Sequence, residues 1–149
     1  NKFKINFSNS YILDLFSGVG SFGIECLSRG VKKVIFVENY SGVLPLLKKN
    51  LISLKSIQNY EIIEKDIYKD NVFLKLNYKF DIIFLDPPYK NKGLENLFNE
   101  IENQNILNKN GIIILHRHKN EQDSFSSSFK FIEQKVYGIS KIIFLSNLN

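Results

Sequence analysis

The stretch that decides the fold is "LDLFSGVGSFGIECLSRG", residues Leu13 to Gly30. It starts as an apolar segment, passes through closely spaced glycines and continues with the apolar spacing of a helix. Gly18, Gly20 and Gly23 match the pattern G-x-G-x-x-G, in which glycine allows a tight turn and a close approach of backbone to ligand. The following helix offers free N–H groups at its start. This order predicts a loop that binds a nucleotide-like ligand.

An acidic residue follows the second apolar segment, at the position where a carboxylate can bind the ribose of a nucleotide-like ligand. Glu38 stands 20 residues after Gly18, and a carboxylate there can accept hydrogen bonds from both hydroxyls of a ribose. The alternative is a solvated charge at the end of a strand. Ser17 in the glycine loop and Asn39 beside Glu38 complete this part of the predicted cofactor site.

The glycine pattern does not choose between NAD and S-adenosylmethionine (SAM), but Asp14 favours SAM. Asp14 lies inside an apolar strand, where an unpaired carboxylate is costly. A cationic ligand nearby would offset that cost, and SAM carries an ammonium and a sulfonium, whereas the pyrophosphate of NAD would be repelled. The alternative is that Asp14 caps backbone N–H groups of the loop.

A second motif, "DPPY", follows the apolar run Phe80–Leu85 and comprises Asp86, Pro87, Pro88 and Tyr89. Ligands of open α/β sheets bind beyond the carboxyl ends of the strands, so this motif and the glycine loop should face one crevice. The carboxylate and a rigid proline carbonyl can hold the two hydrogens of a planar amine and stabilise charge that grows on its nitrogen. The tyrosine can stack on an unstacked base. We predict these four residues as the catalytic loop.

Asp66 follows the third apolar run and should lie beside the same crevice. It could accept a hydrogen bond from the amino group of adenine, with Ile67 contributing its backbone N–H or packing. Capping of a helix that starts at Ile67 is the alternative.

Short apolar runs alternate with helix-length stretches, which predicts an α/β fold with a mainly parallel sheet. The expected strands are Tyr11–Phe16, Lys33–Val37, Tyr60–Glu64, Phe80–Leu85 and Gly111–Leu115. The expected helices are Phe22–Arg29, Val43–Leu54, Ile67–Leu76 and Gly93–Ile106. Two further strands, Phe129–Val136 and Ser140–Leu145, should form an antiparallel hairpin around Tyr137-Gly138.

The composition is that of a folded domain. The chain has 149 residues, 44% of them apolar and 23% charged, and we expect one domain over residues 1–149. The single cysteine, Cys26, should be buried.

A net charge of +5 permits an anionic partner such as RNA, and equally a mildly basic surface. No run is apolar enough to span a bilayer. Because methionine is absent, we expect an upstream segment to be missing.

The glycine stretch, Glu38, "DPPY" and the Tyr-Gly pair between the last strands resemble the RsmD-like methyltransferases. These bacterial enzymes methylate the exocyclic N2 amine of a guanine in 16S ribosomal RNA. The resemblance implies a Rossmann-like, doubly wound, seven-stranded class I methyltransferase fold, SAM as cofactor and no metal. It implies ribosomal RNA, in the small subunit or an assembly intermediate, as partner. We also expect a cytoplasmic monomer.

The chain departs from that family in two places. The family carries a basic N-terminal segment with an Arg-Pro-Thr motif, and it more often has an acid where this chain has "HRH", residues 116–118. A solvated strand end, a contact with RNA phosphate and a metal site remain alternatives for "HRH". Three other functions also remain open: an adenine-N6 nucleic-acid methyltransferase, an NAD-dependent oxidoreductase, and a non-catalytic remnant that binds SAM or RNA.

Overall fold

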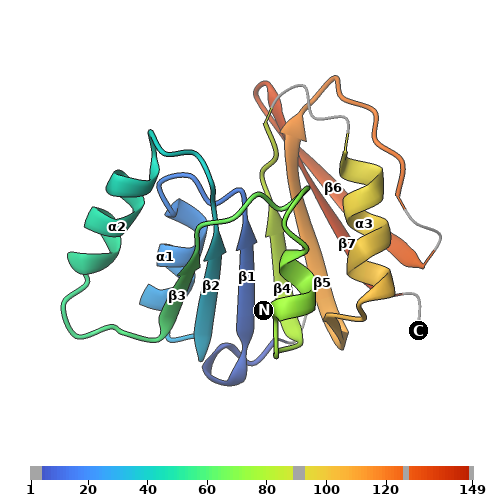
Figure 1. Ribbon diagram of the computed structural model, residues 1–149. Helices are drawn as coiled ribbons and strands as arrows, with labels where there is room; N and C mark the ends of the chain where they lie inside the picture. Colours follow the sequence, from blue (N-terminus) through green and yellow to red (C-terminus); the bar gives the residue numbers. More distant parts are fainter. Residues whose placement is uncertain (1–4, 89–92, 126–127, 148–149) are drawn as a thin grey trace.

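A computed structural model describes residues 5–88, 93–125 and 128–147. Within these residues seven strands form one sheet of order β3-β2-β1-β4-β5-β7-β6 (Figure 1). The parallel strands are β1 (Tyr11–Leu15), β2 (Lys33–Val37), β3 (Tyr60–Ile63), β4 (Phe80–Leu85) and β5 (Leu107–His118). The antiparallel hairpin is β6 (Phe129–Tyr137) and β7 (Ser140–Asn147), with β7 inserted beside β5. This confirms the expected doubly wound sheet with a C-terminal hairpin.

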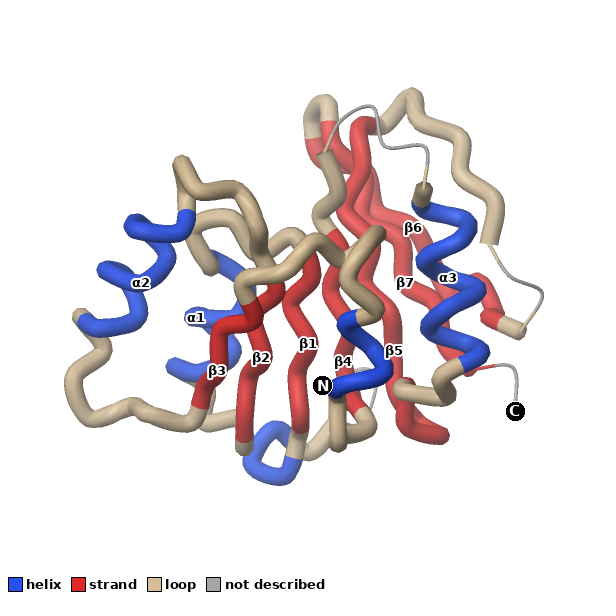
Figure 2. Tube along the Cα trace, viewed as in Figure 1, coloured by secondary structure: helices blue, strands red, loops and turns tan. Residues whose placement is uncertain are grey.

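Helices cover the two faces of the sheet (Figures 1 and 2). Helices α1 (Ser21–Ser28) and α2 (Leu44–Ile52) pack on one face. Helix α3 (Leu94–Asn103) and the short 3₁₀ helix η2 (Val72–Lys75) pack on the other. None of the helices within the described ranges is long and apolar enough to cross a membrane.

The strands are apolar on both sides because both sides are covered. Alternation sends Ile12 of β1 and Phe36 of β2 toward α1 and α2, whereas Leu13 and Leu15 face α3 and η2. All four side chains are fully buried, and burying each contributes about 1.5–3 kcal/mol. Cys26 of α1 is buried in the same layer, as expected, and burial raises the pKa of its thiol to about 12.

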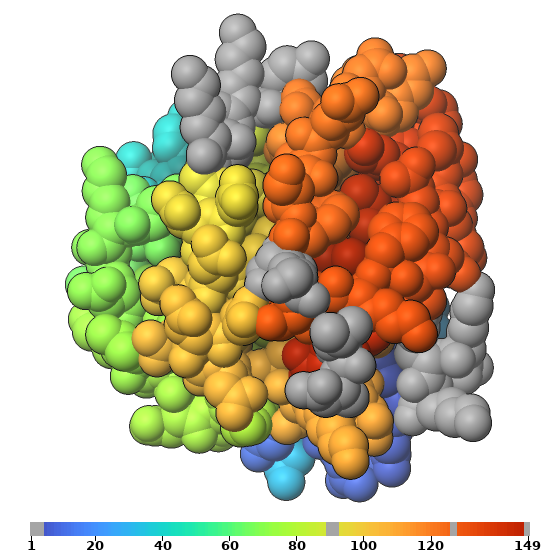
Figure 3. Space-filling model, turned by 90° about the vertical axis from the view of Figure 1, so that its right-hand side faces the viewer, coloured from blue at the N-terminus to red at the C-terminus, as the bar shows by residue number. Residues whose placement is uncertain are grey.

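The pairing of β7 with β5 joins the hairpin to the sheet, and aromatic packing against α3 adds to it. Phe129 at the start of β6 meets Phe98 of α3 edge-on, with ring centroids 5.9 Å apart. Figure 3 looks onto this side, with α3 in yellow beside the orange and red hairpin strands. Further along β6, which is the edge strand, Phe131 and Val136 are exposed.

The expected helix Ile67–Leu76 is wrong. Residues 67–69 form a turn, and η2 is the only regular element in that range. Asp66 caps this turn, as considered from the sequence, because its Oδ1 accepts a hydrogen bond from Tyr68 N and its backbone oxygen accepts from Asp70 N. Asn71 then adopts a left-handed conformation with φ +49°, which ends any continuing helix.

Candidate active site

The glycine loop turns sharply at the carboxyl end of β1. Phe16, Gly18 and Gly20 have φ values of +56°, +56° and +88°, and Gly20 N donates to Ser17 O over 2.8 Å. A side chain on Gly18 would meet no protein atom within 4 Å. Phe16 is not a glycine, so its left-handed backbone costs about 1 kcal/mol, and strain of this kind concentrates at ligand sites.

The other two glycines of the motif serve packing. A Cβ on Gly20 would lie 2.6 Å from Leu47 Cδ1 of α2, and one on Gly23 would lie 2.3 Å from Phe36 Cε1 of β2. Real Cβ atoms do not approach so closely. Gly23 therefore lets α1 sit close to β2, and Gly20 lets the glycine loop approach α2. Neither glycine borders the ligand cleft.

Glu38 joins the loop after β1 to the loop after β2. Its Oε1 accepts a 2.7 Å hydrogen bond from Gly18 N, and its Oε2 accepts from Asn39 N and Tyr40 N over 3.0 and 3.1 Å. The carboxylate is therefore held in place by backbone N–H groups, and it still borders the cleft.

Asp14 is 1% exposed and sits beneath this loop. Its Oδ2 accepts from Gly23 N over 3.1 Å, so the capping role considered from the sequence is present. Its Oδ1 has no hydrogen-bond partner among the described residues. The pKa of Asp14 is raised to about 8, chiefly by burial and also by the nearby carboxylates of Asp86 and Glu38, although the hydrogen bond from Gly23 N lowers it. A cation in the cleft would stabilise the ionised form of Asp14 and the charges of Glu38 and Asp86.

The loops that follow β1, β2, β3 and β4 enclose a cleft of about 560 Å³. It contains the predicted cofactor residues Gly18, Glu38, Asn39, Asp66 and Ile67, together with Asp86 and Pro88 of the second motif. Asp14, Ser17, Gly20 and Gly23 do not line it.

Sequence reasoning missed the aromatic and aliphatic part of this cleft. Its further lining residues are Phe16, Val37, Tyr40, Val43, Lys65 and Tyr68. The rings of Phe16 and Tyr68 lie 5.6 Å apart and form an apolar wall beside Glu38. The signal was available, because most of these residues come directly after an apolar strand, where side chains of parallel sheets meet ligands.

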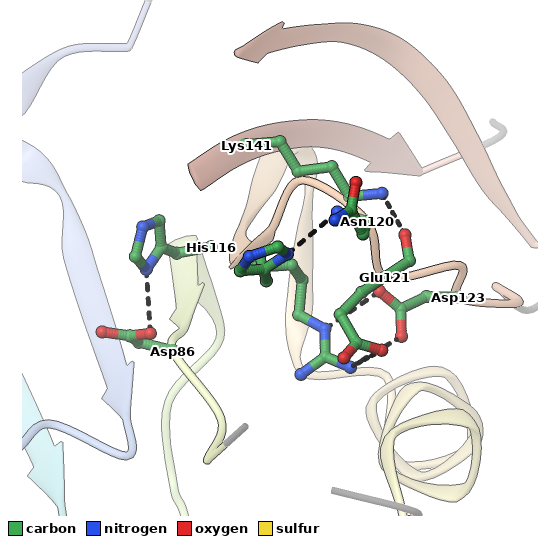
Figure 4. A network of polar contacts seen from close by, with 8 residues as sticks. Asp86, His116, Asn120, Glu121, Asp123 and Lys141 are labelled. Atoms are coloured by element: carbon green, nitrogen blue, oxygen red, sulfur yellow. Dashed lines mark hydrogen bonds and ion pairs between the residues drawn. The ribbon is translucent and has the colours of Figure 1, made fainter. Parts of the chain in front are cut away.

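Asp86 also borders a second cavity. This one measures about 250 Å³ and lies between the proline motif and the ends of β5 and β7, where Pro87, His116 and Ser140 line it. Asp86 Oδ1 lies 2.9 Å from His116 Nδ1 (Figure 4). The fourth residue of the predicted catalytic loop, Tyr89, lies outside the described residues.

Arg117 is neither a solvated strand end nor free to contact phosphate. It is 5% exposed, and its guanidinium bonds Asp123 over 3.0 and 3.1 Å and Glu121 over 3.3 Å. Lys141 Nζ donates to the backbone oxygen of Glu121 (Figure 4). This cluster pins the loop after β5. Among the described residues no group of three or more His, Cys, Asp or Glu side chains could hold a metal ion.

Comparisons with known proteins give similarity along nearly the whole chain. The family described as Conserved hypothetical protein 95 matches residues 1–146. The Ribosomal RNA small subunit methyltransferase D of Haemophilus influenzae is 35% identical over 134 residues, which cover 87% of this chain and 68% of that protein.

Two solved structures share the fold. A conserved hypothetical protein of Streptococcus pyogenes superposes with a TM-score of 0.85 at 25% identity, covering 95% of this chain and 88% of that one. A candidate methylase of Haemophilus influenzae has a TM-score of 0.81 at 33% identity, covering 96% and 89%. The arrangement of sheet and loops is that of class I methyltransferases.

Proposed function

The chain belongs to the RsmD-like methyltransferases, described as Conserved hypothetical protein 95, and from this we propose that it methylates ribosomal RNA with SAM. The proposed acceptor is the exocyclic N2 amine of a guanine in the small-subunit RNA, free or in an assembly intermediate. That finer assignment rests on the family resemblance. The relative from Haemophilus influenzae, named for the small ribosomal subunit, supports the RNA class.

The observation that carries the proposal is the position of Asp86 between two cavities. One is the cleft of about 560 Å³ that also contains Gly18 and Glu38, and the other is the cavity of about 250 Å³ beside Pro87. A carboxylate at such a junction can touch an acceptor held in the smaller cavity while a donor occupies the larger one. Neither cavity holds both partners, so the geometry favours transfer between two bound molecules.

The charges of the larger cleft fit SAM better than a dinucleotide. The carboxylates of Glu38 and Asp86 border this cleft. The carboxyl of Asp14 lies near both and keeps its proton at neutral pH because its pKa is raised to about 8, and a bound cation would favour loss of that proton. A ligand with a sulfonium and an ammonium gains from this negative field, whereas a pyrophosphate is repelled. We propose that Glu38 holds the ribose and that Asp66 and Ile67 lie against the adenine.

When bound, SAM supplies an electrophilic methyl group. The chain's own part is placement and electrostatics. In the proposed step the Asp86 carboxylate and the Pro87 carbonyl accept hydrogen bonds from the two N–H groups of the amine. This aims the nitrogen lone pair toward the larger cleft and stabilises the positive charge that would develop as the N–C bond forms, while the methyl–sulfur bond would break and S-adenosylhomocysteine would leave. Asp86 is also the first group to which the surplus proton can pass.

Calorimetric titration of the chain with SAM, S-adenosylhomocysteine and NAD tests the cofactor. We expect micromolar binding of the first two and none of NAD. Glu38→Ala should weaken SAM binding by roughly 1–3 kcal/mol, the scale of a hydrogen bond to a charged group. Binding of NAD in place of SAM would overturn the proposal, and unchanged affinity of the variant would remove Glu38 from the ribose site.

The reaction is tested on small ribosomal subunits that lack methylated guanine-N2. Transfer of labelled methyl groups, followed by nuclease digestion and mass spectrometry, identifies the modified nucleoside. Asp86→Ala should abolish transfer while SAM binding largely survives, and Glu95→Ala, which removes an exposed carboxylate of α3, should change neither. N6-methyladenosine as the product would refute the guanine assignment.

A further inference from the structure

We propose that His116 is a positioning residue, which fixes the Asp86 carboxylate for methyl transfer. The inference deepens the proposed function and rests on it. It starts from the 2.9 Å contact between His116 Nδ1 and Asp86 Oδ1. In Figure 4 these two side chains point toward each other, apart from the carboxylates of Glu121 and Asp123.

The contact is built by the sheet. Strands β4 and β5 are parallel neighbours, and their register pairs Phe84 with Ile114 and Leu85 with Leu115. The next step of the same register brings Asp86 beside His116. Both residues therefore stand at the carboxyl end of the sheet, on the edge of the smaller cavity. Rigid strands fix the pair, although 30 residues separate its members.

The chemistry of the two groups defines the hydrogen bond. An ionised carboxylate only accepts, so the imidazole nitrogen that faces it must carry a proton. His116 Nδ1–H thus occupies one oxygen of Asp86 and fixes the rotation of the carboxylate. The second oxygen stays available for the amine of the acceptor. The Asp86 side chain is half exposed, so without His116 the carboxylate would rotate among several orientations.

The hydrogen bond leaves the charge of the carboxylate in place. With a neutral imidazole the pair of Asp86 and His116 carries one negative charge, which stabilises the positive charge that grows on the acceptor nitrogen.

Three variants separate positioning from simple packing. His116→Asn keeps a donor at the place of Nδ1 but cannot become charged, whereas His116→Leu removes the donor. Glu95→Gln is the control, because Glu95 is exposed on α3 and lines neither cavity. We expect His116→Leu to lower kcat about 10- to 100-fold at every pH, as displaced catalytic groups do. SAM affinity should stay unchanged.

Rescue by the conservative variant is the decisive kinetic readout. His116→Asn should restore most of the kcat that His116→Leu loses, whereas SAM affinity should change little in either variant. The inference is overturned if His116→Asn is as slow as His116→Leu, or if His116→Leu keeps the wild-type kcat.

An experiment without substrate tests the pair itself. Nitrogen NMR of the imidazoles at pH 8.5 reports which ring nitrogen carries the proton, and free neutral histidine favours Nε2–H. We expect His116 as the Nδ1–H tautomer in wild type and a shift toward Nε2–H in Asp86→Ala. Nε2–H in wild type would overturn the inference even if methyl transfer is confirmed. An inactive wild type with the Nδ1–H tautomer would instead overturn the proposed function, and the catalytic role of His116 with it.

Discussion

At the scale of single residues, Asp14 couples the stability of the fold to the charge of the site. Its carboxyl is buried, one oxygen caps Gly23 N, and its pKa is raised to about 8. In the unfolded chain the same group titrates near its ordinary value of about 4. Between these two values the folded protein holds a proton that the unfolded chain has released. Folding stability from this group is therefore complete below about pH 4 and is lost as pH rises toward 8.

Replacing Asp14 by asparagine should remove this loss. The amide keeps an oxygen for Gly23 N and carries no charge, so the variant should gain stability relative to wild type by about 1 kcal/mol for each pH unit between 5 and 8. Urea denaturation at three pH values measures the difference. Glu95→Gln, which changes an exposed side chain, is the control, and its free energy of unfolding should vary with pH as that of wild type does. If the difference in the free energy of unfolding between Asp14→Asn and wild type is the same at pH 5 and pH 8, the raised pKa of Asp14 is contradicted.

At the scale of elements, the glycines of one motif divide between packing and binding. Ala at position 23 would force its Cβ to within 2.3 Å of Phe36 and push α1 away from the sheet, whereas Ala at position 18 meets no protein atom. We expect Gly23→Ala to cost about 1–3 kcal/mol of stability. Gly18→Ala should cost about 1 kcal/mol for its positive φ and should also weaken SAM binding, because Gly18 lines the cleft.

Thermal denaturation and calorimetry with SAM read the two effects separately. For Gly23→Ala, the protein that remains folded should bind SAM with an affinity close to that of wild type. For Gly18→Ala, the loss of SAM binding free energy should exceed the loss in the free energy of unfolding. The division of roles is wrong if Gly18→Ala binds SAM as wild type does, or if Gly23→Ala is as stable as wild type.

The loop after β5 depends on a buried ion pair. Arg117 and Asp123 have side chains 3% and 9% exposed, with nitrogen and oxygen 3.0 Å apart. Removing one member leaves the other charged and buried, so Asp123→Ala should lower the free energy of unfolding by about 3 kcal/mol. The double variant Arg117→Met, Asp123→Ala should recover part of this loss, which denaturation of the three proteins would measure. Glu61→Ala removes an exposed ion pair with Lys33 and should cost under about 1 kcal/mol.

The same scale shows what the sequence could predict. The strands Lys33–Val37 and Phe80–Leu85 were predicted to the residue because a strand buried on both faces is a continuous apolar run with polar ends. Strand β5 begins at Leu107, four residues earlier than expected, because its polar opening "NKN" resembles a turn. The expected helix Ile67–Leu76 is wrong because the turn that Asp66 caps stops at Asn71, whose backbone is left-handed.

At the scale of the whole molecule, parallel strands explain which parts of the site could be predicted. Glu38, Asp66 and Asp86 each follow an apolar run, and parallel strands deliver their ends to one edge of the sheet. The partner of Asp86 could not be found in this way. Residues 86 and 116 belong together only through the register of β4 on β5, which no local pattern encodes. The buried ion pair of Arg117 likewise depends on a loop that folds back onto its own strand.

This topology predicts which backbone amides a bound cofactor will protect from hydrogen exchange. The loops after β1, β2 and β3 line the larger cleft, so S-adenosylhomocysteine at 100 times its Kd should slow amide hydrogen exchange in residues 16–20, 38–43 and 65–68. The ligand can slow exchange by at most about 100-fold, which corresponds to about 2.7 kcal/mol, at amides whose exchange requires the ligand to leave. The loops at the other end of the parallel strands, residues 30–32, 57–59 and 76–79, contribute nothing to that cleft and serve as controls within the same molecule. They should exchange at unchanged rates because they open locally with the ligand still bound. Equal slowing at both ends would mean that exchange proceeds through global unfolding, and slowing confined to the control loops would place the ligand at the wrong edge of the sheet and refute the site.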